Sequence, residues 1–227
     1  SAASDVYKRQ GCDPWQAIND IDGFFFHRPY AHMPVQGLAL IYLAALHQSG
    51  HLSQLAELAK SKAIELSAVA DELNNPVDLF DQLQRDPGFQ LYPNAMRLAA
   101  LLRRTESFRD FQQAKLGLGQ QLTSELGNLY TASLPSWIAA GLEDAYHQNV
   151  DIAGQSFWAI GYGSGDASEA IPLQVSPSWR EAAAKIKFHH ALANAQDLQQ
   201  VQYEALHDQG QDLSLIHISE PTRLRHI

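Results

Sequence analysis

The clearest hydrophobic segment near the start of the chain is DGFFFH, residues 22–27, in which three phenylalanines follow two turn-forming residues. A short apolar run bounded by turn residues is typical of a buried strand. Arg28 precedes Pro29, so the chain should stay extended there. The apolar stretch 34–48 begins with a proline, is followed by Gly50, and predicts a helix.

The middle of the chain alternates amphipathic stretches with proline and glycine breaks. Residues 52–73 predict a second, more polar helix, and the Asn-Asn-Pro that follows should break it. Residues 96–104 have helical character, and residues 124–145 contain another helix whose small residues permit close packing. The helices predicted here are separated by loops marked by proline and glycine.

The last third begins with the pattern of a strand pair. Residues 155–165, QSFWAIGYGSG, predict a strand that ends in a glycine-rich turn, and the alternating residues 170–176 predict its antiparallel neighbour. A helix should open near Ser178, where SWRE has the form of a capping box. Strands and helices mix along the chain, so the predicted class is α/β, as one domain or half of a larger one.

The two ends have an unusual relation at the level of codons. DVYKRQ, residues 5–10, can be encoded by a string whose reverse complement encodes LSLIHI, residues 213–218. Ligated DNA produces such inverted repeats, and both segments resemble a translated transposase sequencing adapter. We therefore expect residues 1–10 and 213–227 to be adapter-derived, with residues 11–212 as the protein proper. A pair of genuine tails is the alternative.

Composition narrows the function. The chain is 45% hydrophobic and 18% charged, which is ordinary for a globular protein. Its formal charge of −9 argues against general nucleic-acid binding, which depends on basic patches. We see no apolar run long enough to cross a membrane and no secretory signal. The single cysteine, Cys12, fits a reducing compartment, so a cytoplasmic location is expected.

Three segments could carry chemistry. His27 ends the predicted strand, where α/β folds place their ligands, although a hydrogen-bonded core histidine is an equal alternative. Asn128, in GNLYTAS, could hold a substrate carbonyl, or it could be a helix N-cap. The GYGSG turn, residues 161–165, could offer backbone N–H groups to an oxyanion, or it could be a plain hairpin turn.

Other candidate residues favour structural interpretations. His47 and His51 have the spacing of a metal pair, but Gly50 should end the helix between them, so we expect no metal site. His189 and His190 are adjacent, point different ways on a helix, and are expected on the surface. Cys12 lies in a loop with no basic neighbour, so it is not expected to act as a nucleophile.

The order of three motifs, FHRPYAHM, GNLYTASL and GYGSG, resembles the C-terminal half of 3-hydroxy-3-methylglutaryl-CoA synthases, members of the thiolase superfamily. The resemblance covers most of residues 20–190, and the helical stretch at about 50–112 resembles an insertion in that family. It implies half of a thiolase-like αβαβα layered fold. Ketoacyl-carrier-protein synthases share the fold, but the HRPY and YGSG contexts fit them less well.

The resemblance implies an acyltransferase of the mevalonate pathway that joins acetyl-CoA to acetoacetyl-CoA through an acetylated cysteine. A glutamate forms the enolate that attacks the acceptor ketone. Both catalytic residues belong to the N-terminal half in this family. The chain is therefore expected to be an incomplete, inactive part of a homodimeric enzyme that uses coenzyme A thioesters as substrates and no other cofactor.

The resemblance also implies roles for individual residues. His27 would polarise the acetoacetyl thioester carbonyl, and Asn128 would hydrogen-bond the acyl carbonyl near it. His32 departs from the family, which usually has a lysine contacting coenzyme A at that position. The implied substrate-binding residues are Arg28, Tyr30, His32, Tyr162, Gly163 and Ser164.

Two other functions fit the same motifs. A relative of these synthases adds a β-branch to an acyl chain on a carrier protein, and the departure at His32 leaves that acceptor open. A thiolase-fold subunit that binds or scaffolds without turnover is the alternative outside enzymes. The upstream sequence separates these possibilities best, because it would contain or lack the cysteine and glutamate.

Overall fold

The computed structural model describes residues 13–75, 77–127, 129–162, 168–195 and 197–207. They form two compact units, each described here by itself. The first contains the described residues up to Asp22 together with His32–Ala114. The second contains Gly23–Ala31 and the described residues from Lys115 onward. Both predicted terminal segments, 1–10 and 213–227, lie outside the described residues.

A three-stranded sheet organises the second unit. Its strands are β1 (Gly23–Phe26), β2 (Ser156–Tyr162) and β3 (Ser168–Gln174), in the order β1-β2-β3. β1 runs parallel to β2, with Phe25 opposite Ala159, and β2 runs antiparallel to β3. The predicted strand at 22–27 and the predicted antiparallel pair are confirmed, and so is the α/β class.

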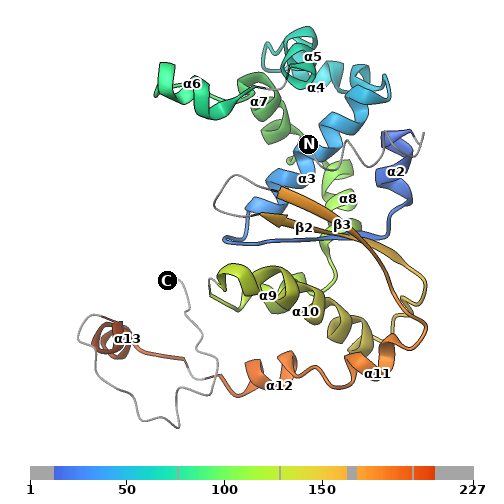
Figure 1. The fold of residues 1–227 in the computed structure, drawn as a ribbon, viewed down its shortest axis with the longest axis vertical. Coiled ribbons are helices and arrows are strands. Elements are labelled where there is room, and N and C mark those ends of the chain that lie inside the picture. Colours follow the sequence, from blue (N-terminus) through green and yellow to red (C-terminus); the bar gives the residue numbers. More distant parts are fainter. Residues whose placement is uncertain (1–12, 76, 128, 163–167, 196, 208–227) are drawn as a thin grey trace. The chain divides into compact units, whose positions relative to one another are not determined.

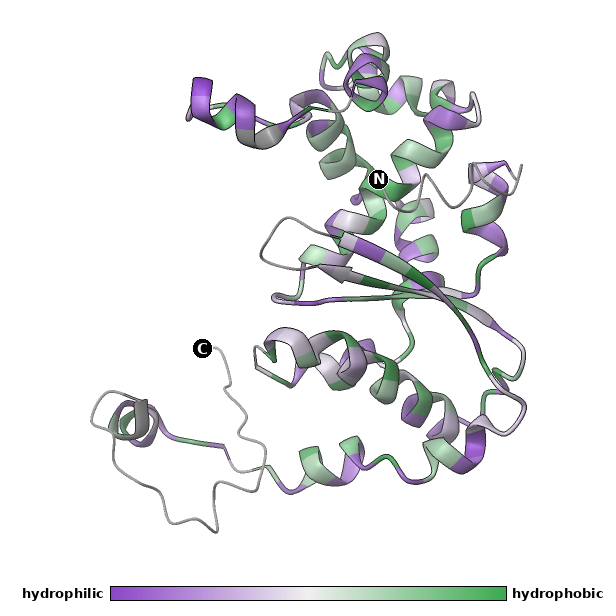
Figure 2. Cartoon of the chain, viewed as in Figure 1, coloured by the Kyte–Doolittle hydropathy of each residue, from purple (hydrophilic) through white to green (hydrophobic). Residues whose placement is uncertain are grey.

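Helix α10 (Ser133–His147) lies along one face of this sheet (Figure 1). Hydrophobic residues occur along most of α10 (Figure 2). Phe25 of β1 meets the Trp137 ring edge-on at 6.4 Å between centroids. A Cβ at Gly141 would lie 2.7 Å from the Phe25 ring, so glycine is needed for this close approach. The small residues predicted to allow close packing on this helix do so here.

Shorter helices complete the second unit. They are α9 (Gln120–Ser124), the 3-10 turn η2 (Tyr130–Ala132), α11 (Trp179–Ala183), α12 (Phe188–Ala193) and α13 (Gln200–His207). Ala145 of α10 packs with Ile152 and with Trp179 and Ala183 of α11 in a buried cluster. α11 begins where the sequence predicted a helix. The predicted capping box is wrong, because Ser178 makes no side-chain cap and its hydroxyl pairs with that of Ser176 at 3.1 Å.

The first unit is helical in its described residues. Its elements are α2 (Pro14–Asp20), α3 (Met33–Gln48), η1 (Leu52–Leu55), α4 (Ala56–Lys60), α5 (Leu66–Asn74), α6 (Leu79–Arg85), α7 (Pro93–Leu102) and most of α8 (Glu106–Leu116). The core side chains Leu38, Leu43, Val69, Leu98 and Phe108 are fully buried. The predicted helix at 34–48 is confirmed. The stretch 50–112, predicted as an insertion, falls within this unit.

The single helix predicted over residues 52–73 is wrong. The chain instead forms η1, α4 and α5, with a turn between α4 and α5 in which Ala63 has a φ of 49°. Ile64, directly after this residue, is 4% exposed. A continuous helix of L-residues would not contain a left-handed residue, so the conformation of Ala63 marks the break. The buried side chain of Ile64 lies directly after it.

Candidate functional site

The carboxyl ends of β1 and β2 meet at one edge of the sheet, because the two strands are parallel. His27 directly follows β1, and its backbone N–H donates to the Ile160 carbonyl at 2.8 Å. The His27 ring is half-buried and lies 6.3 Å from the ring of Tyr162, the last residue of β2. Open α/β sheets bind ligands at this edge.

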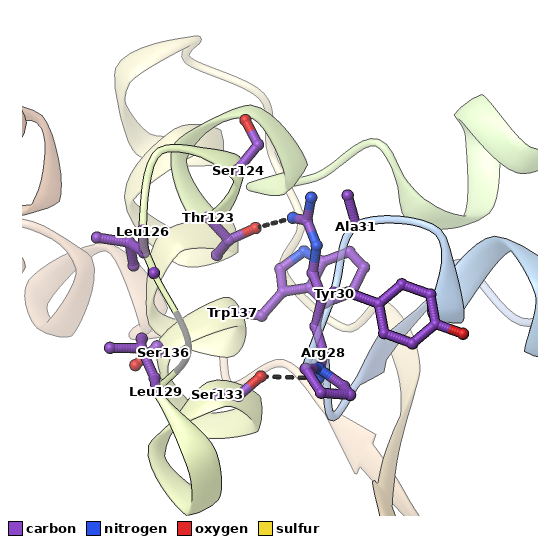
Figure 3. A pocket seen from close by; sticks show the side chains of 12 residues that line it. Arg28, Tyr30, Ala31, Thr123, Ser124, Leu126, Leu129, Ser133, Ser136 and Trp137 are labelled. Atoms are coloured by element: carbon purple, nitrogen blue, oxygen red, sulfur yellow. Dashed lines mark hydrogen bonds between the residues drawn. The ribbon is translucent and has the colours of Figure 1, made fainter. Parts of the chain in front are cut away.

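A pocket of about 330 Å³ lies in the same unit (Figure 3). We call it the Arg28 pocket. Two segments about a hundred residues apart form it, and they carry the first two sequence motifs. Its lining residues are Arg28, Pro29, Tyr30, Ala31, Thr123, Ser124, Leu126, Gly127, Leu129, Ser133, Ser136 and Trp137.

The Arg28 guanidinium forms part of the pocket wall. Its Nη1 donates to the Gln120 carbonyl at 3.1 Å and to the Thr123 hydroxyl at 2.6 Å (Figure 3). Its central carbon lies 5.4 Å from the centre of the Trp137 ring, within the range of a cation–π contact. Burial lowers the pKa of Arg28, but a guanidinium stays protonated in proteins. Among the described residues, no carboxylate forms an ion pair with Arg28.

The backbone of Arg28 ties the two motifs together. Its N–H donates to the Ser133 hydroxyl at 2.7 Å, across 105 residues of sequence. Ser133 is the first residue of α10 and is 6% exposed. Ser133, Ser136 and Trp137 all line the pocket, so the first turn of α10 lies at its wall. The positive end of the helix dipole therefore adds to the Arg28 charge.

The predicted binding residues have different placements. Tyr30 lines the pocket and is 53% exposed. Tyr162 is 44% exposed and lies beside the His27 ring. His27 does not line the Arg28 pocket, although the next residue does. His32 is exposed at the position before α3 and belongs to the first unit.

Three predicted site residues, Asn128, Gly163 and Ser164, lie outside the described residues. Their described neighbours give the surroundings. Gly127 and Leu129 both line the Arg28 pocket. Tyr162 and Ser168 are the described residues on either side of the glycine-rich turn, and the Ser168 hydroxyl donates to the Gly161 carbonyl at 2.9 Å.

Only Arg28 and Tyr30 of the pocket wall were predicted from the sequence; among the residues not predicted, Thr123, Ser133 and Trp137 contact Arg28. Thr123 and Trp137 carried no motif signal. Ser133 ends the GNLYTAS motif, and a small polar residue at the start of an otherwise apolar helix was an available signal. Its partner could not be predicted, because the Arg28 amide is distant in sequence.

The arrangement can bind a small ligand with an oxygen that carries, or develops, negative charge. A fixed cation, a helix start and several hydroxyls face one cavity, and leucines and Trp137 supply apolar surface. Ligand pockets combine apolar walls with a few placed polar groups in this way. Preorganised donors stabilise an oxyanion because they need not reorient when charge develops.

The comparisons with known proteins agree with the motifs. The family model described as hydroxymethylglutaryl-coenzyme A synthase C terminal matches residues 3–213. A curated protein, the hydroxymethylglutaryl-CoA synthase of Haloferax volcanii, is 25% identical over 122 residues, which are 54% of this chain and 27% of that protein.

A solved structure, described as MvaS in complex with 3-hydroxy-3-methylglutaryl coenzyme A, matches with a TM-score of 0.47 and 20% identity. The match covers 82% of this chain and 34% of that one. The chain thus spans about a quarter to a third of the length of these relatives. Because the family model matches most of the sequence, the chain belongs to the hydroxymethylglutaryl-CoA synthase family, as its C-terminal part.

Proposed function

We propose that this chain is the part of an acyl-CoA condensing enzyme, of the hydroxymethylglutaryl-CoA synthase type, that holds the acyl acceptor. The observation that carries this proposal is the hydrogen bond from the Arg28 N–H to the Ser133 hydroxyl. It joins the segment after His27 to the segment after Asn128 at one pocket. His27 itself does not line this pocket, but it directly precedes Arg28, which does.

His27 is the proposed electrophilic catalyst. An imidazole N–H can donate to the acceptor's thioester carbonyl, and the strand before it holds the ring at the sheet edge. Asn128 is the proposed second donor, to the acyl carbonyl. Backbone N–H groups of Gly163 and Ser164 are proposed to stabilise the acyl-enzyme oxygen, with Tyr162 beside them.

Arg28 has a proposed positioning role. Its guanidinium is bound to the α9 segment and stacked on Trp137, so it fixes the HRPY segment and contributes positive charge. Tyr30, half-exposed in the pocket lining, is proposed to contact the thioester arm. His32, exposed at the start of α3, is proposed to meet a coenzyme A phosphate.

We propose that the covalent steps use a cysteine and a glutamate from outside this chain. In the proposed reaction a cysteine takes the acetyl group from acetyl-CoA and the coenzyme A thiol leaves. A glutamate removes a methyl proton, and the enolate attacks the acetoacetyl ketone. Water then hydrolyses the bond between the acyl group and the cysteine, which frees the product. We assign the cysteine and the glutamate to the part of the relatives that this chain does not span. The chain alone should therefore bind acceptor without condensing it.

Binding of acetoacetyl-CoA to the full chain tests this function. Titration calorimetry should give saturable one-to-one binding, which His27→Ala weakens at least about tenfold, or about 1.4 kcal/mol. His51→Ala is the matched control, because that exposed histidine lies in the helical unit and should leave the affinity unchanged. Equal affinity of the wild type and His27→Ala would refute the role of His27.

Binding of a second ligand shows whether the acyl acceptor is attached to coenzyme A or to a carrier protein. Acetoacetyl-pantetheine has the acyl end and the arm but lacks the nucleotide of coenzyme A. Weaker binding of acetoacetyl-pantetheine than of acetoacetyl-CoA supports a coenzyme A acceptor. Equal binding would contradict the proposed contact of His32 with a phosphate and would point to an acceptor on a carrier protein.

A further inference from the structure

A second cluster of polar side chains lies between α10 and α12, and none of its members lines the Arg28 pocket. Glu143 and His147 are four residues apart, on one face of α10. His189 comes from α12, which lies beside the end of α10. His147 Nε2 lies 3.6 Å from Glu143 Oε1, and His189 Nδ1 lies 3.5 Å from Glu143 Oε2. The two imidazole rings are 4.4 Å apart.

The carboxylate of this cluster is buried. Glu143 is 2% exposed, and a buried carboxylate is costly unless a positive group compensates it. Among the described residues, the two histidines are the side chains within ion-pair distance of Glu143 that are able to carry a positive charge. The His189 backbone N–H also donates to Oε2 at 3.2 Å. His189 Nδ1 is itself buried and has no hydrogen-bond partner among the described residues.

We propose that Glu143, His147 and His189 bind a divalent transition-metal ion, with Zn²⁺ as the best match. His147 Nε2 approaches Glu143 Oε1 and His189 Nδ1 approaches Glu143 Oε2, at 3.6 Å and 3.5 Å. The two atoms of either pair, each about 2.1 Å from a zinc ion, would form an angle of about 110–120° at the metal. That angle is close to tetrahedral. The ligand atoms all lie within 4.8 Å of one another, so small rotations of the two exposed rings bring them into the coordination sphere.

The ligand set selects the class of metal. Imidazole suits Zn²⁺, Cu²⁺ and Ni²⁺, whereas Mg²⁺ and Ca²⁺ prefer sites made of oxygen alone. The ion would supply the positive charge that the buried Glu143 carboxylate needs and would give His189 Nδ1 a partner. The side chains of His147 and His189 are 51% and 42% exposed, so solvent can reach the site and provide a fourth ligand.

A metal ion bound here would link α12 to α10. α12 is a helix of 6 residues, too short to be stable by itself, and the His189 backbone contact is one of its links to α10. The expectation that His189 lies on the surface holds for part of its side chain, which is 42% exposed, whereas its Nδ1 atom is buried beside Glu143. His190, the next residue, is exposed and bonds within its own helix to Asn194.

Cobalt titration of the metal-free full chain tests the site, because Co²⁺ replaces Zn²⁺ and absorbs visible light in tetrahedral sites. The wild type should show these absorption bands saturating at one equivalent, and Zn²⁺ should displace them. His147→Ala and His189→Ala should each weaken binding at least about 10–100-fold, as loss of even an outer partner does. His190→Ala is the matched control and should bind as the wild type does.

A measurement on the unaltered chain guards against misfolded variants. X-ray absorption of the zinc complex should show two imidazoles and one carboxylate around the metal, and zinc should slow hydrogen exchange in residues 188–193. Binding that survives both His147→Ala and His189→Ala would place the metal on other histidines and overturn the proposal. Absence of stoichiometric binding would also overturn it.

Discussion

Replacement of Ser133 by alanine should loosen the link between the two motifs. The Ser133 hydroxyl is buried and accepts the Arg28 N–H at 2.7 Å. Alanine fits the same space but leaves this amide without its acceptor. An unsatisfied buried amide costs about 1–3 kcal/mol, and the lower half of that range applies because Arg28 is only half-buried. The melting temperature should fall by about 2–4 °C for each kcal/mol in a chain of this length.

Tryptophan fluorescence during urea denaturation measures this loss of stability in the second unit, which contains Ser133. Three of the four tryptophans, Trp137, Trp158 and Trp179, lie in the second unit. Ser178→Ala is the matched control, because it removes an exposed hydroxyl in the same unit and should change stability by less than about 0.5 kcal/mol. If Ser133→Ala were as harmless as Ser178→Ala, the hydrogen bond would not hold the two segments together.

Two further predictions concern the same unit. Gly119→Ala should lower the free energy of unfolding more than Gly154→Ala does. Both glycines have positive φ (69° and 75°), but a Cβ at 119 would collide with the Gly141 backbone, whereas one at 154 would meet nothing within 4 Å. Urea midpoints measure the difference, and equal losses of stability would contradict the close packing on α10. The Asp151 carboxyl accepts hydrogen bonds from the Ala153 N–H and the Trp179 indole N–H, and these bonds lower the pKa of Asp151 in the folded state. The ionised carboxyl therefore stabilises the fold at pH values above its unfolded pKa of about 3.9. This stabilisation is lost as the pH falls through the lower pKa of the folded state. Asp151→Asn should therefore be less stable than the wild type at neutral pH and equal to it at strongly acidic pH; melting curves over a pH series check this, and a constant difference would contradict it.

Local patterns in the sequence predicted the three strands, the antiparallel pairing of β2 with β3, and the helices α3 and α10, but not the parallel pairing of β1 with β2. Three consecutive phenylalanines predicted β1, and the proline and glycine that bound residues 34–48 predicted α3. The break between α4 and α5 could not be predicted, because Ala63 adopts a left-handed conformation with no glycine to signal it. Ile64, directly after this turn, is buried.

The sites depend on contacts between residues that are far apart in sequence. The order of the motifs predicted that His27 and Asn128 belong to one site. The structure places Arg28, Gly127 and Leu129 on the Arg28 pocket, but His27 does not line it and Asn128 lies outside the described residues, so this stays a prediction. The acceptor of the Arg28 amide could not be predicted. The same holds for the partner of His189, because Glu143 precedes it by 46 residues and no periodicity connects two different helices.

The most direct test of the proposed function is the carbon NMR signal of the thioester carbonyl in acetoacetyl-CoA labelled at that carbon. A carbonyl that accepts a hydrogen bond becomes more polarised, and its signal moves downfield. We predict such a shift when the labelled ligand binds the full chain. The shift should be lost in His27→Ala at saturating ligand and kept in His51→Ala. A bound ligand whose carbonyl signal stays at its free position, or shifts equally in His27→Ala, would contradict the proposal that His27 polarises the acceptor.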